Sequence, residues 1–392
     1  MKAGARGRQR WVRLHRWLGV GLLVFWIVMG LSGSALVLYR EVLNHLRPVQ
    51  AASPAMPIDL DGVHRALRAA HPDRRGAWRI ELPLEAGDPV VARYMKPAES
   101  AGKAFAPLMV WVDPVSLQVR HQVLWGSEPM TWLYDLHLSL LLDADGRHIV
   151  GALGVLMTVS LVSGLILWWP RPGRWRQAWV FKRQASVERQ VYDVHKLAGA
   201  GGGLLLLILC VSGVLLTWHR QIEPWLNRVS PLFEPPVPVI SGMPDQPLAR
   251  LAAVAQGLFP RARLRWVETA GLQGGQVRVQ MWQPGEPSRR FPRTQVWLDA
   301  HTGEVRATRD GLTQQAGDAF LAWLHPLHNG EAAGLVGRIM VLLSGSLPVV
   351  LGITGWWRWR HKRRAARLVL ARRRSTATAA ACQREEGVPG SV

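Results

Sequence analysis

The stretch from residue 195 to residue 221, HKLAGAGGGLLLLILCVSGVLLTWHRQ, is an apolar segment that opens with a histidine and contains a Ser-Gly pair. Residues 15–41, HRWLGVGLLVFWIVMGLSGSALVLYRE, repeat this arrangement. One offset of 180 residues relates the two copies, from His15 to His195 and from Gly33 to Gly213. An apolar run of about 20 residues is long enough to cross a bilayer as a helix. The chain is therefore predicted to contain a duplicated membrane-spanning unit.

A second pair of histidines repeats in the same way. His137 lies in WLYDLHLSL and His328 in WLHPLHNGE, each ahead of an apolar run that ends in Ser-Gly (163–164) or Thr-Gly (354–355). An ionisable side chain near a membrane interior is costly and usually functional. Four histidines in register suggest cofactor ligands. The alternative, that each is an interfacial residue which tolerates both water and lipid, stays open.

The charge distribution indicates a membrane protein. The 392 residues are 48% hydrophobic, yet they include 48 Lys and Arg against 27 Asp and Glu. The basic excess gathers in residues 2–16, 171–196 and 358–374, next to the apolar runs. Lys and Arg at such borders are typical of cytoplasmic segments. We therefore expect the protein to associate with a membrane and not to bind nucleic acid.

We predict a membrane α-helical fold with four transmembrane helices, arranged as two helix–module–helix repeats with two periplasmic α+β modules. Because all three basic clusters are placed on one side, both termini are expected in the cytoplasm of a bacterium, with the chain crossing the inner membrane. The predicted segments are a cytoplasmic N-terminus (1–16), span one (17–39), module one (40–147), span two (148–170), a cytoplasmic loop (171–196), span three (197–219), module two (220–335), span four (336–358) and a disordered cytoplasmic tail (359–392).

The two modules are predicted to share one layout. Alternating apolar residues flank an Asp-rich or Gly-rich turn in residues 110–119 and again in 295–305, which indicates β-hairpins. Ahead of them, residues 61–70 and 247–258 have the apolar spacing of a helix.

These motifs, in this order, resemble the PepSY-associated transmembrane family over roughly residues 10–365. The family includes iron-regulated inner-membrane proteins and ferric-siderophore reductases. The matching sequences are HRWLG (15–19), LSG (31–33), DLH (135–137), GLILWWP (164–170) and DVHK (193–196). The resemblance implies a haem-containing oxidoreductase that carries electrons across the inner membrane to a periplasmic ferric complex and releases Fe(II).

Haem also follows from where the histidines are expected to lie. His15 and His195 precede spans that leave the cytoplasm, whereas His137 and His328 precede spans that enter from the periplasm. Two imidazoles at one depth can supply both axial ligands of a b-type haem. We predict these four residues as haem iron ligands, for two haems b, and identify no other catalytic residue.

Several residues have two interpretations. His148 and His219 are second-rank ligand candidates without counterparts in the other repeat, and His325 competes with His328 for one role. Trp125, Trp132 and Trp323 are candidate ligand contacts. The glycines near the histidines, which are Gly19, Gly21, Gly199, Gly201, Gly202 and Gly203, either make room for a porphyrin or serve tight helix packing.

The predicted substrate is a ferric siderophore or another ferric chelate. The electron donor is a quinol or a cytoplasmic flavoprotein, because no Gly-rich dinucleotide motif follows a soluble strand. Two other functions stay open, a membrane-anchored PepSY binding or regulatory module without redox activity, and a component of siderophore or iron transport. Visible absorbance separates the first function from the other two.

Overall fold

The computed structural model describes residues 2–45, 58–85, 87–238, 245–271 and 274–386. The chain divides into two compact units. Unit 1 consists of Met1–Gly30, Leu156–Leu207 and Ser346–Val392, and unit 2 consists of Leu31–Val155 and Ile208–Gly345.

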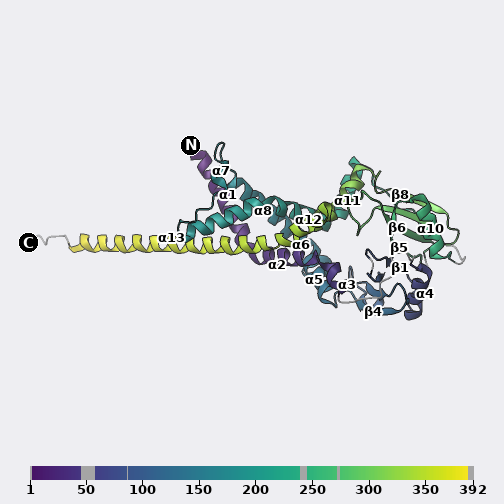
Figure 1. The fold of residues 1–392 in the computed structure, drawn as a ribbon. Coiled ribbons are helices and arrows are strands. Elements are labelled where there is room, and N and C mark those ends of the chain that lie inside the picture. The colour runs from purple at the N-terminus through teal and green to yellow at the C-terminus, as the bar shows by residue number, and fades with distance from the viewer. Residues whose placement is uncertain (1, 46–57, 86, 239–244, 272–273, 387–392) are drawn as a thin grey trace, which may run out of the picture. The chain divides into compact units, whose positions relative to one another are not determined.

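The helices account for most of the structure (Figure 1). They are α1 (Lys2–Gly21), α2 (Leu23–Leu36), α3 (Tyr39–His45), α4 (Leu60–Ala70), α5 (Pro129–Ser139), α6 (Asp143–Trp168), α7 (Trp175–Ala178), α8 (Val187–Thr217), α9 (His219–Val229), α10 (Leu248–Leu258), α11 (Ala316–Asn329), α12 (Gly334–Ser344) and α13 (Ser346–Glu386), with single 3₁₀ turns at Ala98–Ser100 and Glu331–Ala333.

Within the described residues, three helical segments are long and apolar enough to cross a membrane. They are Asp143–Trp168, Val187–Thr217 and Glu331–Ala371. A fourth candidate is the pair Arg6–Gly21 and Leu23–Leu36, which is bent by 63°. Gly19 and Gly21 precede the bend, and glycine weakens a helix interior. The four segments correspond to the four predicted spans.

The helices extend beyond the predicted spans. Span three was predicted from residue 197, but α8 begins at Val187, and α1 begins at Lys2 rather than near residue 17. His15 and His195 therefore lie inside helices instead of opening them. The tail also differs from the expectation of disorder, because α13 continues to Glu386 through a sequence rich in Ala and Arg, which favour helix. Residues 387–392 lie outside the described residues.

Unit 2 contains a single eight-stranded antiparallel sheet. Its order is β4-β3-β2-β1-β5-β6-β7-β8, so that each module contributes four consecutive strands. The modules join edge to edge, where β1 pairs with β5 and Ile80 lies opposite Val267. The strands are β1 (Trp78–Glu81), β2 (Val90–Tyr94), β3 (Leu108–Val112), β4 (Val119–Leu124), β5 (Arg263–Glu268), β6 (Gln276–Trp282), β7 (Thr294–Asp299) and β8 (Val305–Arg309).

The two faces of this sheet have different neighbours. Successive side chains of a strand point to opposite faces. On one face, Ile80, Val110 and Val279 pack with Val63 of α4 and Leu251 of α10 in the main hydrophobic core. The predicted helices at 61–70 and 247–258 are therefore confirmed as α4 and α10. On the other face, a second cluster joins strand residues to α3 and α5.

Both predicted hairpins are present and have the same turn. Asp113 Oδ1 accepts hydrogen bonds from the backbone N–H groups of residues 115 and 116, each at 3.0 Å. Asp299 does the same with residues 301 and 302, also at 3.0 Å. The second carboxylate oxygen pairs with the arginine seven positions on, Arg120 in one turn and Arg306 in the other. The shared turn supports the duplication.

Candidate functional site

Histidine pair 1 consists of His15 on α1 and His195 on α8, both in unit 1. Their imidazole ring centres lie 6.2 Å apart, and the ring planes are inclined by 73°. Equivalent residues of the two repeats thus face one another.

Histidine pair 2 consists of His137 on α5 and His328 on α11, both in unit 2. Their ring centres lie 6.1 Å apart, and the planes are inclined by 47°. Helix α5 begins with Pro129 and a capping box made by Glu128, while α11 ends at Asn329 and is followed by Gly330, whose φ of 82° favours glycine. Both histidines therefore lie near the C-terminal ends of defined short helices rather than in loops.

Each of the four histidines is held by a Ser or Thr hydroxyl from another helix. The contact uses Nδ1 of the imidazole in every case. The nitrogen–oxygen distances are 3.1 Å for His15 and Ser163, 2.9 Å for His195 and Thr354, 2.9 Å for His137 and Ser32, and 3.2 Å for His328 and Ser212. The hydroxyl always comes from the same repeat as its histidine, whereas the partner histidine comes from the other repeat.

The direction of these hydrogen bonds is set by the hydroxyl groups. Ser163, Ser212 and Thr354 each donate to a backbone carbonyl of their own helix, at 2.7, 2.6 and 2.6 Å. A hydroxyl has one proton, so its oxygen is left to accept from the imidazole N–H. Nδ1 therefore carries the proton in these three contacts.

Backbone carbonyls lead to the same tautomer for two of the histidines. His15 Nδ1 lies 3.0 Å from the Ser160 carbonyl oxygen, and His328 Nδ1 lies 3.0 Å from that of Leu209. Because a carbonyl only accepts, Nδ1 must donate, and the lone pair is then on Nε2. A neutral imidazole oriented through one nitrogen is the form that binds a metal through the other.

A glycine follows each of these hydroxyl residues, and the histidine ring lies against it. A Cβ added at Gly33, Gly164 or Gly213 would lie 2.9 Å from the Cε1 atom of His137, His15 or His328, respectively. At Gly355 the corresponding distance to His195 is 3.3 Å. The Ser-Gly and Thr-Gly pairs are therefore seats for the four histidine rings.

The separation within each pair fits two imidazoles on one metal. With imidazole–metal bonds of about 2 Å through Nε2 on opposite sides of one ion, two ring centres are about 6 Å apart. Both observed separations match this value. Within the described residues, no group of three or more His, Cys, Asp and Glu side chains could hold a metal ion.

The glycines around pair 1 fall into two groups. A Cβ at Gly19, one turn beyond His15, would meet no atom within 4 Å, and the same holds for Gly21 and Gly201. Gly202 and Gly203 instead lie against Leu347 and Leu165, at 2.2 and 3.2 Å from an added Cβ. Gly202 and Gly203 therefore serve helix packing, whereas Gly19 leaves space on the helix face that carries His15.

The second-rank histidines have other contacts. His148 is exposed, and its Nδ1 accepts from Trp218 Nε1 at 3.3 Å. His219 Nδ1 lies 2.8 Å from the Leu216 carbonyl oxygen. His325 contacts Asn329 and the ring of Phe291.

Burial keeps the histidines of α11 neutral. It lowers the pKa of His328, and it lowers the pKa of His325 to about 3, with Arg290 adding to the effect. A neutral ring is the ligating form of imidazole.

Trp125 is buried rather than available to a ligand. Its exposed fraction is 4%, and its Nε1 donates to Asp135 Oδ1 at 2.8 Å. Asp135 belongs to the DLH sequence of α5, so this bond fixes the helix that carries His137. Trp132 and Trp323 are exposed. The sequence did not reveal that Ser and Thr hydroxyl groups anchor the four histidines, although the recurrence of Ser or Thr before glycine was visible.

Comparison with known proteins found a family match and a curated relative. Residues 12–362 match the model of the family described as the PepSY-associated TM region. The chain is also 29% identical over 262 residues to the uncharacterized protein PA4219 of Pseudomonas aeruginosa. That alignment covers 60% of this chain and 64% of the relative, so the chain spans a little under two thirds of the relative's length.

Proposed function

The chain belongs to the PepSY-associated TM family, and from this premise we propose that it is a haem-b electron-transfer protein that reduces a ferric chelate. The family assignment and the apolar helices make it a membrane protein. The remainder of the proposal rests on the two histidine pairs.

One observation carries the proposal, namely that two separate pairs have the same construction. In both pairs the rings come from different repeats, are about 6 Å apart, and are seated on a hydroxyl residue followed by glycine. Duplication explains why the two histidines of one pair are alike, but it does not explain why pair 1 and pair 2 share a seat and a spacing. Bis-imidazole coordination needs that spacing and a contact at Nδ1 that orients each ring.

The chain's own residues would bind and orient the cofactor. The Ser and Thr hydroxyls hold the imidazoles through Nδ1, and the glycines allow the rings to approach the neighbouring helix. When bound, haem b supplies a centre that accepts and releases one electron at a time.

The reaction balances with a two-electron donor. A quinol that loses two electrons and two protons would reduce two ferric ions, each taking one electron. Fe(II) binds hard oxygen ligands less tightly than Fe(III), which favours release. We propose the basic clusters as the cytoplasmic side of an inner membrane and the sheet of unit 2 as the periplasmic side.

The direct test is reoxidation of pre-reduced protein by a ferric chelate. The full-length protein in detergent is reduced anaerobically, freed of reductant and mixed with the chelate, and Fe(II) is trapped by a chromogenic chelator. We expect one Fe(II) per haem electron. His137→Ala should abolish or greatly slow the reaction, whereas His148→Ala, the matched control, should react as wild type.

A redox-inert gallium(III) chelate provides a second control, since it should leave the protein reduced. Reduced haem that persists in the presence of the ferric chelate would contradict the reductase and favour the anchored binding module.

A further inference from the structure

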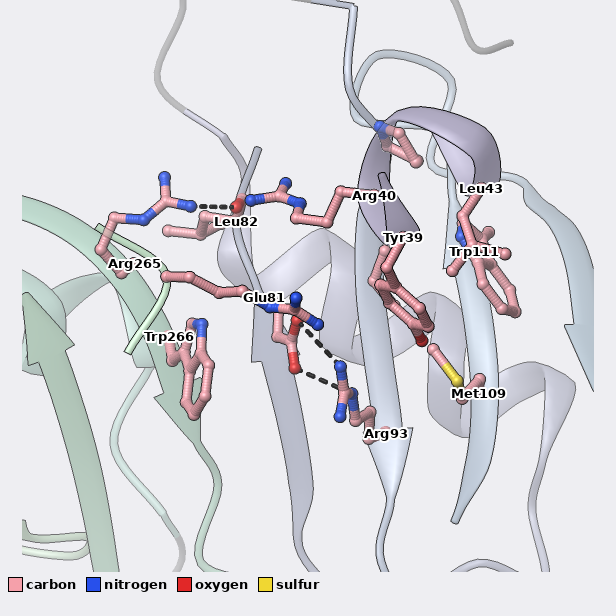
Figure 2. A pocket seen from close by; sticks show the side chains of 13 residues that line it. Tyr39, Arg40, Leu43, Glu81, Leu82, Arg93, Met109, Trp111, Arg265 and Trp266 are labelled. Atoms are coloured by element: carbon pink, nitrogen blue, oxygen red, sulfur yellow. Dashed lines mark hydrogen bonds and ion pairs between the residues drawn. The ribbon is translucent and has the colours of Figure 1, made fainter. Parts of the chain in front are cut away.

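A concave pocket lies on the sheet face opposite α4 and α10, and all of its lining belongs to unit 2. The pocket is open on one side, and its empty space of about 510 Å³ includes open solvent. Its floor is formed by β1, β2 and β3 of the first module together with β5 of the second, and α3 contributes Tyr39 and Arg40 (Figure 2). The pocket exists only because β1 and β5 join the two modules.

The charge of this lining is strongly positive. It contains four arginines and one carboxylate, which are Arg40, Arg93, Arg265, Arg290 and Glu81. Figure 2 shows Glu81 already paired with Arg93, and the ion-pair distance is 2.8 Å. Arg40 pairs with Asp88 at 3.2 Å. Arg265 and Arg290 are the two remaining cations of the lining.

Among the residues that the structure describes, neither Arg265 nor Arg290 forms an ion pair with a carboxylate, although Glu81 and Asp88 partly offset the charge of Arg265. Arg265 is 6% exposed and donates only to the neutral backbone carbonyls of Pro83 and Leu82, at 2.7 and 3.2 Å. Arg290 instead lies over the ring of Tyr39, 4.9 Å from its centre. Burial lowers the pKa of Arg265, and the neighbouring charge of Arg40 lowers it further. A guanidinium nonetheless stays charged at neutral pH, so the site has more positive than negative charge.

Unpaired donors also point to a missing ligand. Tyr39 is 3% exposed, and its buried hydroxyl has no hydrogen-bond partner in the described part of the chain; the same is true of Arg265 Nε. Burial raises the pKa of Tyr39, which keeps its hydroxyl protonated. A buried donor without an acceptor is unfavourable, so natural sites retain one where a ligand supplies the acceptor.

We propose that this pocket binds an oxygen-rich anionic chelate, of the tris-catecholate class, through Arg265, Arg290 and the Tyr39 hydroxyl. Trp266, which is half-buried, provides a flat apolar surface for an aromatic ring of such a ligand. Recognition of the anion rests on the pocket alone, whereas the presence of iron in it rests on the proposed function.

The packing around the pocket connects it with pair 2. On one side, the ring of Tyr39 contacts those of Trp125 and Tyr134, with centres 6.3 and 6.0 Å apart, and Tyr134 belongs to α5. On the other side, Arg290 lies over Phe291, whose ring centre is 4.2 Å from that of His325 on α11. Helix α5 thus contacts the lining directly through Tyr134, and α11 contacts it through Phe291.

The test measures binding without electron transfer. Gallium(III) tris-catecholate is titrated into the full-length protein in nanodiscs of neutral lipid, and quenching of tryptophan fluorescence or calorimetry reports binding. We expect saturable binding that weakens as salt is added, because salt screens the charges. Neutral gallium(III) tris-hydroxamate should bind at least tenfold more weakly.

Variants identify the site. Arg290→Gln and Tyr39→Phe should each weaken binding about tenfold, the loss typical of one hydrogen bond to a charged group. Arg250→Gln on α10, across the sheet, is the matched control and should bind as wild type. Circular dichroism melting shows whether each variant is folded, and an unfolded variant is replaced by Arg290→Lys, which should still weaken binding because it loses the planar guanidinium.

The outcomes separate this proposal from the reductase. A colourless protein that still binds the gallium chelate in an Arg290-dependent way would support the pocket and end the haem proposal. Absence of saturable binding, equal binding of the neutral chelate, or equal binding by the Arg290 and Arg250 variants would overturn the pocket. Loss of chelate binding in nanodiscs that contain anionic lipid would assign the pocket to a lipid headgroup and would also overturn it.

Discussion

His195 Nδ1 lies 2.9 Å from the hydroxyl oxygen of Thr354, and the residue after Thr354 is the glycine against which the same imidazole ring lies. Three other histidines repeat this relationship with Ser32, Ser163 and Ser212. Duplication has therefore preserved a seat for each ring as well as the ring itself.

The hydroxyl anchor can be tested with Thr354→Val, which keeps the shape of the side chain but removes the acceptor for His195 Nδ1. Loss of a group that orients a metal ligand typically weakens binding 10- to 100-fold. We expect a comparable fall in haem affinity, measured by haem transfer to an excess of apomyoglobin. Thr217→Val is the control, because Thr217 donates to the Gly213 carbonyl oxygen at 2.8 Å and lies in the same apolar helix as His195. Equal haem loss in the two variants would contradict an anchoring role.

The glycine seats predict a graded series. Alanine at Gly33, Gly164 or Gly213 places a methyl group 2.9 Å from a histidine carbon, so the ring must shift, and we expect altered or lost haem bands. Gly355→Ala, at 3.3 Å, should have a smaller effect. Gly201→Ala meets no atom within 4 Å and should leave the spectrum unchanged. Haem spectra that do not follow this order of effects would argue against the role of these glycines as seats for the histidine rings.

The Asp turns predict a pH-dependent stability. The hydrogen bond from Arg306, followed by the backbone N–H of Thr302, holds the pKa of Asp299 well below its usual range. A depressed carboxyl pKa adds stability above the pKa of the unfolded chain, and that stability is lost as pH falls toward the folded value. Asp299→Asn should therefore lower the thermal midpoint by several degrees at pH 7.

Melting curves followed by circular dichroism should show this difference undiminished down to about pH 5 and shrinking below the ordinary aspartate pKa of about 3.9. Glu304→Gln, in the same turn, is a charge-matched control and should change the midpoint less, since Glu304 is the longer-range partner of Arg306 at 3.5 Å. A difference between wild type and Asp299→Asn that stays constant from pH 7 to pH 3 would contradict the carboxylate's role.

Local patterns in the sequence were sufficient for the spans, the hairpins and the identity of the paired histidines. The 180- and 191-residue offsets are visible because duplication copies a ligand and its surroundings together. Apolar composition, however, marks only the part of a helix that contacts lipid. It gave no sign that α8 begins at Val187 or that α13 continues to Glu386, because polar helix formers such as Arg, Gln and Glu extend a helix without an apolar pattern.

Long-range pairing explains the other differences. The β1–β5 junction pairs Ile80 with Val267, which are far apart in the sequence, and no local pattern specifies the edge at which two modules meet. The pocket lined by Arg265 and Arg290 depends on that junction, so the sequence could not predict it for the same reason. The hydroxyl groups before Gly33, Gly164, Gly213 and Gly355 were visible as a repeat, but their contacts with the histidines required the packed helices.

The most direct test of the two-site haem account is the haem content of the wild-type protein, His15→Ala and His137→Ala, each purified in detergent. Pyridine haemochrome and reduced-minus-oxidised spectra give the haem b content per chain, and His219→Ala is the control. The account predicts two low-spin haems in the wild type and in the control, and one in each of the other two variants. A colourless wild type, or variants that retain both haems, would contradict it.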